Sequence, residues 1–212
     1  MGIGLGIGGI MANTNIDEKN QDRYQDDVRS SSTDNFADVM KTFGEGKYLI
    51  PLSLFTAAFP EIIPESSATS SIGKWGRLTS RAYLVGGPPL LLLQRATGAS
   101  RPGENDDGSR WKPFNDSNGV SGHAFIGAVP FLSAARMSSN RLLRYGLYVA
   151  STLTAWSRIN DNEHYASQAM LGWYLAWEAV KAVSESNAND QELKVSPLFL
   201  NEGVGIQVYK QF

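Results

Sequence analysis

The chain has 212 residues, 42% hydrophobic and 10% aromatic, with 19 Lys and Arg against 21 Asp and Glu. This length suits one domain with a complete core, and a net charge of −2 excludes the broad basic surface of a nucleic-acid-binding protein. Because the chain has no cysteine, disulfides, thiolate zinc sites and cysteine nucleophiles are excluded.

Hydrophobic residues recur at helical spacing along most of the chain. Thr33 or Asp34 can cap the first helix, and Gly44 ends it. In chain order, the predicted helices cover residues 34–43, 47–58, 75–94, 121–137, 140–159 and 163–186. Glycines and prolines at 86–89 are expected to kink or break the third helix, and a polar loop at 101–119 separates it from the fourth.

The two ends of the chain have a different pattern. Apolar residues alternate with glycine at positions 3–7, and Val204, Ile206 and Val208 also alternate, so we expect short strands there that could pair. The sequence therefore predicts one domain over residues 1–212, an all-α bundle with minor terminal strands, in which 1–32 and 187–212 are peripheral.

No segment of the sequence resembles a membrane span or a signal peptide. Each apolar run is shorter than the roughly 18–20 residues that cross a bilayer, and the first ten residues lack a basic region and a cleavage site. We expect a soluble or peripheral protein rather than a polytopic one, and peripheral membrane contact stays open.

A first polar segment runs from Gln94 to Arg101, followed by Pro102. A residue before proline is held extended, which directs Arg101 away from the helix end, and a guanidinium suits a phosphate group. Taken alone, the segment also fits a solvated arginine at a helix terminus.

A second segment, Ser121-Gly122-His123, lies where a loop enters a helix. Ser121 can cap that helix, Gly122 allows a ligand close to the backbone, and free N–H groups at a helix start bind anions. His123 is placed to exchange a proton beside such an anion. An ordinary N-cap followed by a packed histidine is the simpler alternative.

A third segment carries Arg158, then His164 in the first turn of a helix, with Gln168 four residues further on. The positive end of the helix dipole favours a neutral imidazole, which a nitrogen nucleophile requires. Gln168 shares the helical face of His164 and can reach its ring. A surface histidine beside a charged turn is the alternative interpretation.

Together the segments resemble the three motifs of the type 2 phosphatidic acid phosphatases, which are related to bacterial acid phosphatases and vanadium haloperoxidases. That pattern is Lys, six residues, Arg-Pro; then Pro-Ser-Gly-His; then Ser-Arg, five residues, His, three residues, Asp. The matching residues, in order and spacing, are Arg101-Pro102, Ser121-Gly122-His123, Ser157-Arg158 and His164. The resemblance covers about residues 74–184.

Three positions depart from this pattern. Gln94 replaces the lysine, Val120 the proline and Gln168 the aspartate. Gln94 removes one positive charge and Gln168 removes one negative charge, so the net charge of the pocket is unchanged. A neutral acceptor stabilises a cationic phosphohistidine less, so slower chemistry is expected, and Gln168→Asp is expected to raise turnover. Arg95, Arg110 or Lys112 are candidates to replace the lysine.

The resemblance implies a mechanism without metal or cofactor. His164 would attack phosphorus and form a phosphohistidine, while His123 protonates the leaving alcohol. Gln168 would orient His164. The groups that would hold phosphate are Arg101, Arg158, Ser121, Gly122 and, at the lysine position, Gln94. Phosphate or vanadate could occupy the same site.

Three functions fit these residues: a phosphomonoesterase, a vanadium haloperoxidase, and a catalytically weakened module that binds phosphate or lipid headgroups. The substrate would be a lipid phosphate or a small phosphate ester, with Trp111 and Phe114 as candidate apolar walls. Soluble bacterial relatives suggest the periplasm or cell envelope. The sequence leaves the oligomeric state open.

Overall fold

The computed structural model describes residues 2–64, 66–104, 108–189, 193–200 and 203–210, with side chains described up to residue 186. Its helices are α1 (Gly2–Ala12), α2 (Ile16–Asp27), α3 (Ser31–Thr42), α4 (Gly46–Ala57), α5 (Phe59–Ile62), α6 (Ser67–Thr97), α7 (Gly122–Met137), α8 (Arg141–Asn160) and α9 (Ala166–Asn189). Two strands follow, β1 (Leu193–Leu200) and β2 (Gly203–Lys210). The predicted all-α bundle is confirmed.

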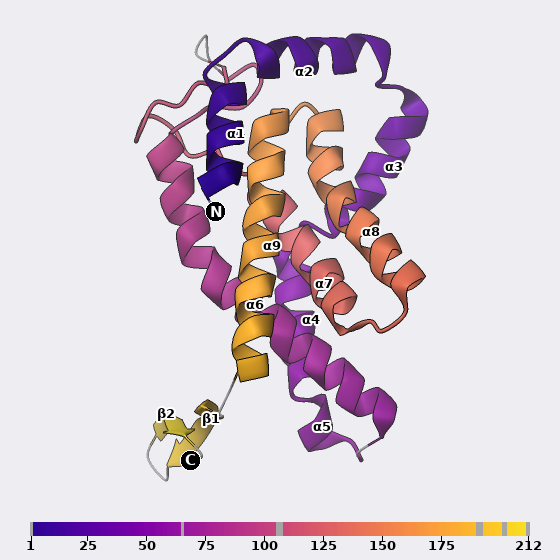
Figure 1. Ribbon diagram of the computed structural model, residues 1–212, viewed down its shortest axis with the longest axis vertical. Coiled ribbons are helices and arrows are strands. Elements are labelled where there is room, and N and C mark those ends of the chain that lie inside the picture. Colours follow the sequence, from indigo (N-terminus) through magenta and orange to yellow (C-terminus); the bar gives the residue numbers. More distant parts are fainter. Residues whose placement is uncertain (1, 65, 105–107, 190–192, 201–202, 211–212) are drawn as a thin grey trace.

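The core lies between α6, α7 and α9, with α8 packed on α7 (Figure 1). Apolar faces of these long helices supply its buried side chains, because residues at helical spacing share one face. The largest of these side chains include Tyr83, Leu90, Phe125, Val129, Leu132, Leu171, Leu175 and Val180. This rigid centre supports the two turns that carry the histidines.

Helix starts follow the capping rules closely. Ser30 caps α3 in a reciprocal capping box with Thr33, so the expected cap at Thr33 or Asp34 is wrong by three residues or more. Ser121 caps α7 as predicted, since its hydroxyl accepts a hydrogen bond from the Ala124 N–H at 3.3 Å.

Helix α6 is not broken at its two prolines, contrary to expectation. Pro88 and Pro89 leave the carbonyls of Leu84 and Val85 without a helical donor, but both of these residues are exposed, so water can satisfy those carbonyls. Gly86 faces inward, where a Cβ would lie 2.5 Å from the Phe125 ring. The glycine therefore serves close packing rather than a break.

The N-terminal segment is helix α1, so the predicted strand there is wrong. Glycines spaced by two in sequence also fall at i and i+4, which is one helical face. A Cβ on Gly4 would lie 2.5 Å from Tyr174 Cδ1, and one on Gly8 would lie 2.8 Å from Leu171 Cδ1. The glycines let α1 pack closely on α9.

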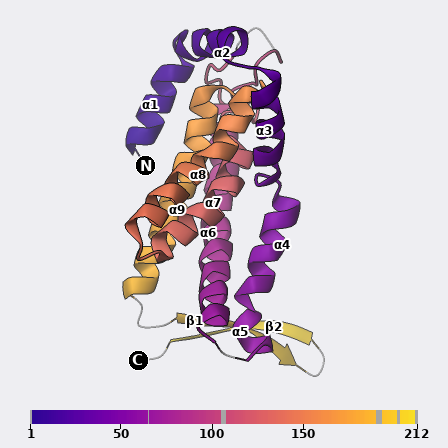
Figure 2. The same ribbon diagram turned by 90° about the vertical axis from the view of Figure 1, so that its right-hand side faces the viewer.

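The predicted C-terminal strand is confirmed as β2, but its partner is β1. The two strands are antiparallel, with Leu193 opposite Lys210 and Leu200 opposite Gly203. Figure 2 shows this hairpin beyond the end of the helical bundle. The expected pairing with the N-terminus does not form, because that segment is helical.

Helices α2 and α3 cover the end of the bundle where α8 passes into α9 (Figures 1 and 2). The Gln21 side chain donates to the Ile159 carbonyl at 3.1 Å and to Asn162 Oδ1 at 2.6 Å. The buried Asp17 carboxylate accepts from the Ser167 N–H at 3.0 Å and from the Ser167 hydroxyl. The N-terminal helices thus hold the turn that contains His164.

Candidate active site

The Ser121 turn is fixed directly to helix α9. The Ser121 N–H donates to the Gln168 carbonyl at 3.0 Å. Gly172, one turn further along α9, has no room for a side chain, because a Cβ there would overlap the Ser121 carbonyl oxygen. Two of the three predicted segments therefore share one backbone contact, which places Ser121 and Gly122 beside the helix that carries Gln168.

His164 lies in the turn between α8 and α9, with only 4% of its surface exposed. Because α9 begins at Ala166, the prediction that His164 lies in the first turn of this helix is wrong. The backbone N–H of His164 donates to the Arg158 carbonyl at 3.2 Å, which closes this turn over the end of α8. Its ring Nδ1 lies 2.9 Å from Gln168 Oε1, as the spacing of four residues predicted.

The surroundings of Gln168 determine the tautomer of His164. Gln168 Oε1 accepts from the Tyr165 N–H at 3.2 Å, and Gln168 Nε2 donates to the Ser100 carbonyl at 2.7 Å. An N–H needs an acceptor and a carbonyl needs a donor, so the amide can have only this orientation. Because Oε1 then faces Nδ1, the His164 proton is on Nδ1 and its Nε2 carries the free lone pair.

Both histidines are disposed to be neutral. Burial lowers the pKa of His164 to about 4. The hydrogen bond that its ring donates to Gln168 acts in the opposite direction, and the charges of Arg101, Arg158 and His123 lower the pKa further. Burial, followed by the charge of Arg158, also lowers the pKa of His123. The same two arginines act on both rings, so the three predicted segments converge on one electrostatic site.

The two arginines meet at one carboxylate. Glu163 Oε2 lies 2.9 Å from an Arg101 guanidinium nitrogen and 3.3 Å from one of Arg158. Arg158 is only 7% exposed, and it also contacts Asp161 at 3.2 Å. Its Nε is buried and has no hydrogen-bond partner among the described residues. A carboxylate therefore lies between the two guanidinium groups, and Arg158 keeps one buried donor without a partner among the described residues.

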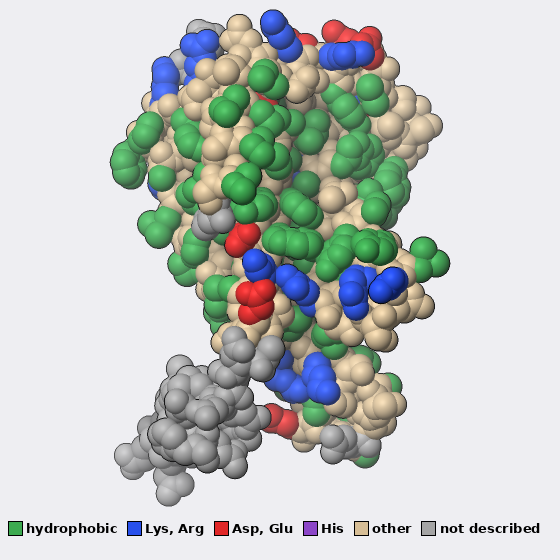
Figure 3. All heavy atoms as spheres, in the orientation of Figure 1, with side chains coloured by type: hydrophobic (Ala, Val, Ile, Leu, Met, Phe, Trp, Pro, Cys, Tyr) green, Lys and Arg blue, Asp and Glu red, His purple; other side chains and the backbone are tan. Residues whose placement is uncertain are grey.

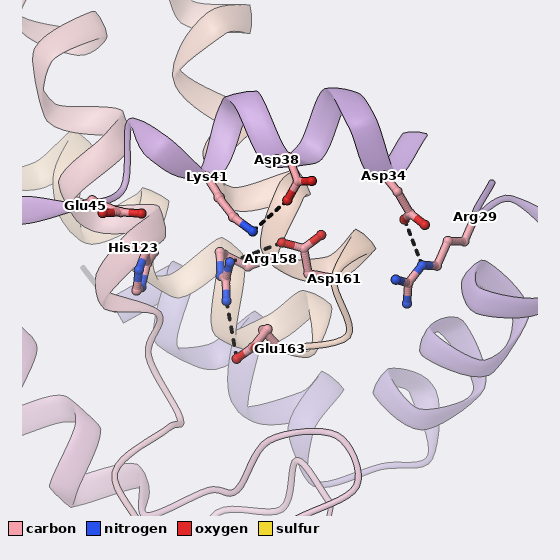
Figure 4. A pocket seen from close by; sticks show the side chains of 9 residues that line it. All are labelled: Arg29, Asp34, Asp38, Lys41, Glu45, His123, Arg158, Asp161 and Glu163. Carbon is pink, nitrogen blue, oxygen red and sulfur yellow. Dashed lines mark hydrogen bonds and ion pairs between the residues drawn. The ribbon is translucent and has the colours of Figure 1, made fainter. Parts of the chain in front are cut away.

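A cavity of about 540 Å³ opens beside this ion-pair network (Figure 4). Charged side chains from α3, the α3–α4 turn and the α8–α9 turn form most of its wall. It is lined by Arg29, Asp34, Asp38, Lys41, Glu45, His123, Arg158, Asp161 and Glu163. His123 and Arg158 reach this cavity, whereas neither His164 nor Arg101 is among the described residues that line it.

Gln94, at the position of the motif lysine, supports the second motif without a charge. Its Nε2 donates to the Val120 carbonyl at 2.9 Å and would lie 3.7 Å from a Cβ on Gly122. The side chain thus lies beside the Ser121–Gly122 turn, where the resemblance placed it, and is bound to backbone.

Other sequence candidates lie elsewhere. Arg95, Arg110 and Lys112 are exposed and are not among the described residues that line the cavity. Trp111 packs against the core and against Gly9, and Phe114 is 78% exposed. None of these five side chains forms a wall of the described cavity.

Sequence reasoning missed the charged residues that α3 and the two turns add, above all Lys41, Glu45 and Glu163. Glu163 could have been noticed because it directly precedes His164. Nothing in the spacing of Lys41 or Glu45 indicates the site, because at least 75 residues separate each of them from Ser121 in the second motif.

The family model of the PAP2 superfamily matches residues 81–190, about half of the chain. The chain belongs to the PAP2 superfamily. The matched stretch contains Gln94, Arg101, the Ser121 turn, Arg158, His164 and Gln168, and membership supports a phosphatase-type hydrolysis of phosphate esters. No curated protein and no solved structure matches the chain. The PAP2 match begins after α5, so the α3 wall of the cavity lies outside it.

Proposed function

We propose that this protein is a phosphomonoesterase that acts through a phosphohistidine on His164. The observation that carries the proposal is the hydrogen bond between His164 Nδ1 and Gln168. Because it places the proton on Nδ1, the lone pair of Nε2 is available to attack phosphorus wherever the His164 ring is neutral, above its pKa of about 4. The N–P bond forms as the bond from phosphorus to the leaving oxygen breaks.

Arg101 and Arg158 would hold the equatorial phosphate oxygens, together with Ser121 and the Gly122 N–H. The transition state spreads negative charge over these oxygens, so fixed cations and N–H donors stabilise it. The unpartnered Nε of Arg158 supports this role, because a buried donor without an acceptor is suited to a ligand. Glu163 has to leave the position that phosphate would take.

The protonated form of His123 would give its proton to the leaving alcohol, and the neutral ring left by this step would then take a proton from the water that hydrolyses the phosphohistidine. Its position in the wall of a cavity that Arg158 and Glu163 also line supports this role, because the cavity offers room for a leaving group. Every atom and proton in both steps comes from the ester, water or these side chains, so the proposal requires no metal and no cofactor.

The alternative is a module that binds phosphate or lipid headgroups without turning them over. Two observations favour it: Gln168 offers a neutral acceptor where a carboxylate would stabilise the phosphohistidine, and Glu163 already occupies the arginine pair. Both polar atoms of the Gln168 amide have partners, because Oε1 accepts hydrogen bonds and Nε2 donates one to the Ser100 carbonyl. A carboxylate at this position would have no donor for that carbonyl. The lost hydrogen bond adds a cost to Gln168→Asp that the sequence did not reveal.

For the substrate we propose a lipid phosphate or a small phosphate ester, encountered in the periplasm or envelope. Among the described residues, no helix is both long and apolar enough to cross a bilayer. Large apolar side chains are nevertheless exposed on α6 and α8, including Leu84, Leu92 and Leu142. Apolar side chains also cover much of the face that Figure 3 shows. This surface supports peripheral contact with lipid.

The test is phosphate release from a chromogenic monoester, and from a lipid phosphate in vesicles, with vanadate binding measured in parallel. We expect release by the parent protein, none by His164→Asn, and strongly reduced vanadate binding by Arg158→Ala. Halide oxidation with vanadate and peroxide would instead identify a haloperoxidase. If the parent binds vanadate but releases no phosphate from either substrate, the binding module is correct.

A further inference from the structure

One cation of the phosphate site is missing from the PAP2 motifs of this chain. Gln94 stands at the lysine position, and its amide is bound to the Val120 carbonyl at 2.9 Å. It can donate a hydrogen bond, but it brings no positive charge. If the protein binds a phosphate group as proposed above, two arginines alone would have to balance a dianion and the nearby carboxylates.

The cavity wall contains a lysine from a different part of the chain. Among the described lining residues the cations are Arg29, Lys41 and Arg158. Arg29 is held by Asp34 at 2.9 Å and lies at the end of the cavity away from His123 (Figure 4). Lys41 lies nearer to His123, and its ammonium points toward Arg158 and Asp161 in the same view.

Helix α3 is fixed so that Lys41 stays over this site. The Thr154 hydroxyl of α8 donates to the Met40 carbonyl at 3.1 Å. At Gly44, one turn after Lys41, a Cβ would lie 2.9 Å from the Cβ of His123. The end of α3 is thus in contact both with the helix that carries Arg158 and with His123 itself.

The ammonium of Lys41 is charged, and not all of its N–H donors are used within the described part of the chain. Its hydrogen bond to Asp38 Oδ1, at 2.6 Å, raises its pKa, and the charge of Asp161 acts in the same direction. Asp38 is exposed, and among the described residues it is the single hydrogen-bond partner of this ammonium. An ammonium has three N–H donors, so two can serve a ligand.

We propose that Lys41, from α3 and outside the PAP2 match, supplies the third cation of the phosphate site in place of the motif lysine. Its ammonium would contact an oxyanion held by Arg158, from the side of the cavity on which His123 lies. This inference rests on the proposed binding of a phosphate group, and it assigns Lys41 a binding role rather than a proton-transfer role.

The test is vanadate binding by the full chain, measured by calorimetry at low salt, for the parent, Lys41→Gln, Lys41→Arg and Lys19→Gln. The matched control removes the same charge from an exposed position on α2 that does not line the cavity. We expect Lys41→Gln to weaken binding about tenfold to a hundredfold, as the loss of one charge-assisted contact does. Lys41→Arg should retain most of the affinity, and Lys19→Gln should equal the parent.

The outcomes separate this inference from the proposed function. If Lys41→Gln binds vanadate as Lys19→Gln does, while Arg158→Ala loses binding, the role of Lys41 is overturned and the phosphate site stands. If Lys41→Arg is as weak as Lys41→Gln, the side chain acts through packing and not through its charge, and the inference is again overturned. A parent protein that binds no vanadate overturns both.

Discussion

Glu163→Gln should tighten the binding of oxyanions, because Glu163 occupies the position between Arg101 and Arg158 that an oxyanion would take. One carboxylate oxygen lies 2.9 Å from Arg101 and 3.3 Å from Arg158. A ligand has to break both contacts before it can make its own. Glutamine has nearly the same size as glutamate but no charge. The substitution therefore removes the ion pairs with both arginines and keeps the volume of the side chain.

The magnitude follows from the exposure of the three side chains. At an effective dielectric constant near 20, two unit charges at about 4 Å attract by roughly 4 kcal/mol. The side chains of Glu163 and Arg101 are 40% and 39% exposed, so solvent screens this pair strongly, whereas the side chain of Arg158 alone is 9% exposed. Exposed pairs contribute about 0.2–1 kcal/mol. With the better-shielded contact between Glu163 and Arg158 added, displacing the Glu163 carboxylate costs a ligand about 1–2 kcal/mol. Glu163→Gln removes this cost, so its affinity for an oxyanion should rise roughly fivefold to thirtyfold.

The assay is vanadate titration of Glu163→Gln and Glu45→Gln at one pH and salt concentration. Glu45 also lines the cavity, but its carboxylate is paired with Lys47 at 2.5 Å and contacts neither arginine. If both variants bind more tightly by the same factor, the effect is the general charge of the cavity. Unchanged or weaker binding by Glu163→Gln would refute the reasoning, and would mean that Glu163 orients the arginines for the ligand.

Three further predictions concern the histidines, Gln168 and the packing of α9. The value of kcat/KM should fall as pH drops through about 4, where His164 gains a proton, and fall again as pH rises through the pKa of His123, which burial holds below 6.5; a flat profile from pH 4 to 8 would contradict these roles. Gln168→Glu should lower the free energy of unfolding by about 1–3 kcal/mol in urea, because its carbonyl partner loses a donor; unchanged stability would show that the amide is not needed there. Gly172→Ala should destabilise the fold and weaken vanadate binding, since a Cβ meets the backbone carbonyl at the start of α7, whereas Gly146→Ala, with open space around it, should add about 0.5–1 kcal/mol of stability; equal melting temperatures for the two variants would contradict this packing.

The long helices and the three motifs could be read from local sequence because local physics determines them. Helix α7 begins where Ser121 caps it, and Gln168, in the first turn of α9, contacts the ring of His164 just before that helix. Each of these features depends on residues within one turn of each other. The same local rules misled at Gly2–Ala12, where a spacing of two in glycines fits both a strand and one face of a helix.

Only the tertiary structure decided how these pieces form a site. The contact of α1 with α9 resolved the ambiguity of its glycines, and the exposed positions of Leu84 and Val85, one turn before Pro88 and Pro89, let α6 continue. Lys41 reaches the cavity because α3 packs on α8, more than 110 residues along the chain. Glu163 bridges two arginines that are distant in sequence. Such contacts depend on which helix faces bury each other, and that is a property of the whole core rather than of any short segment.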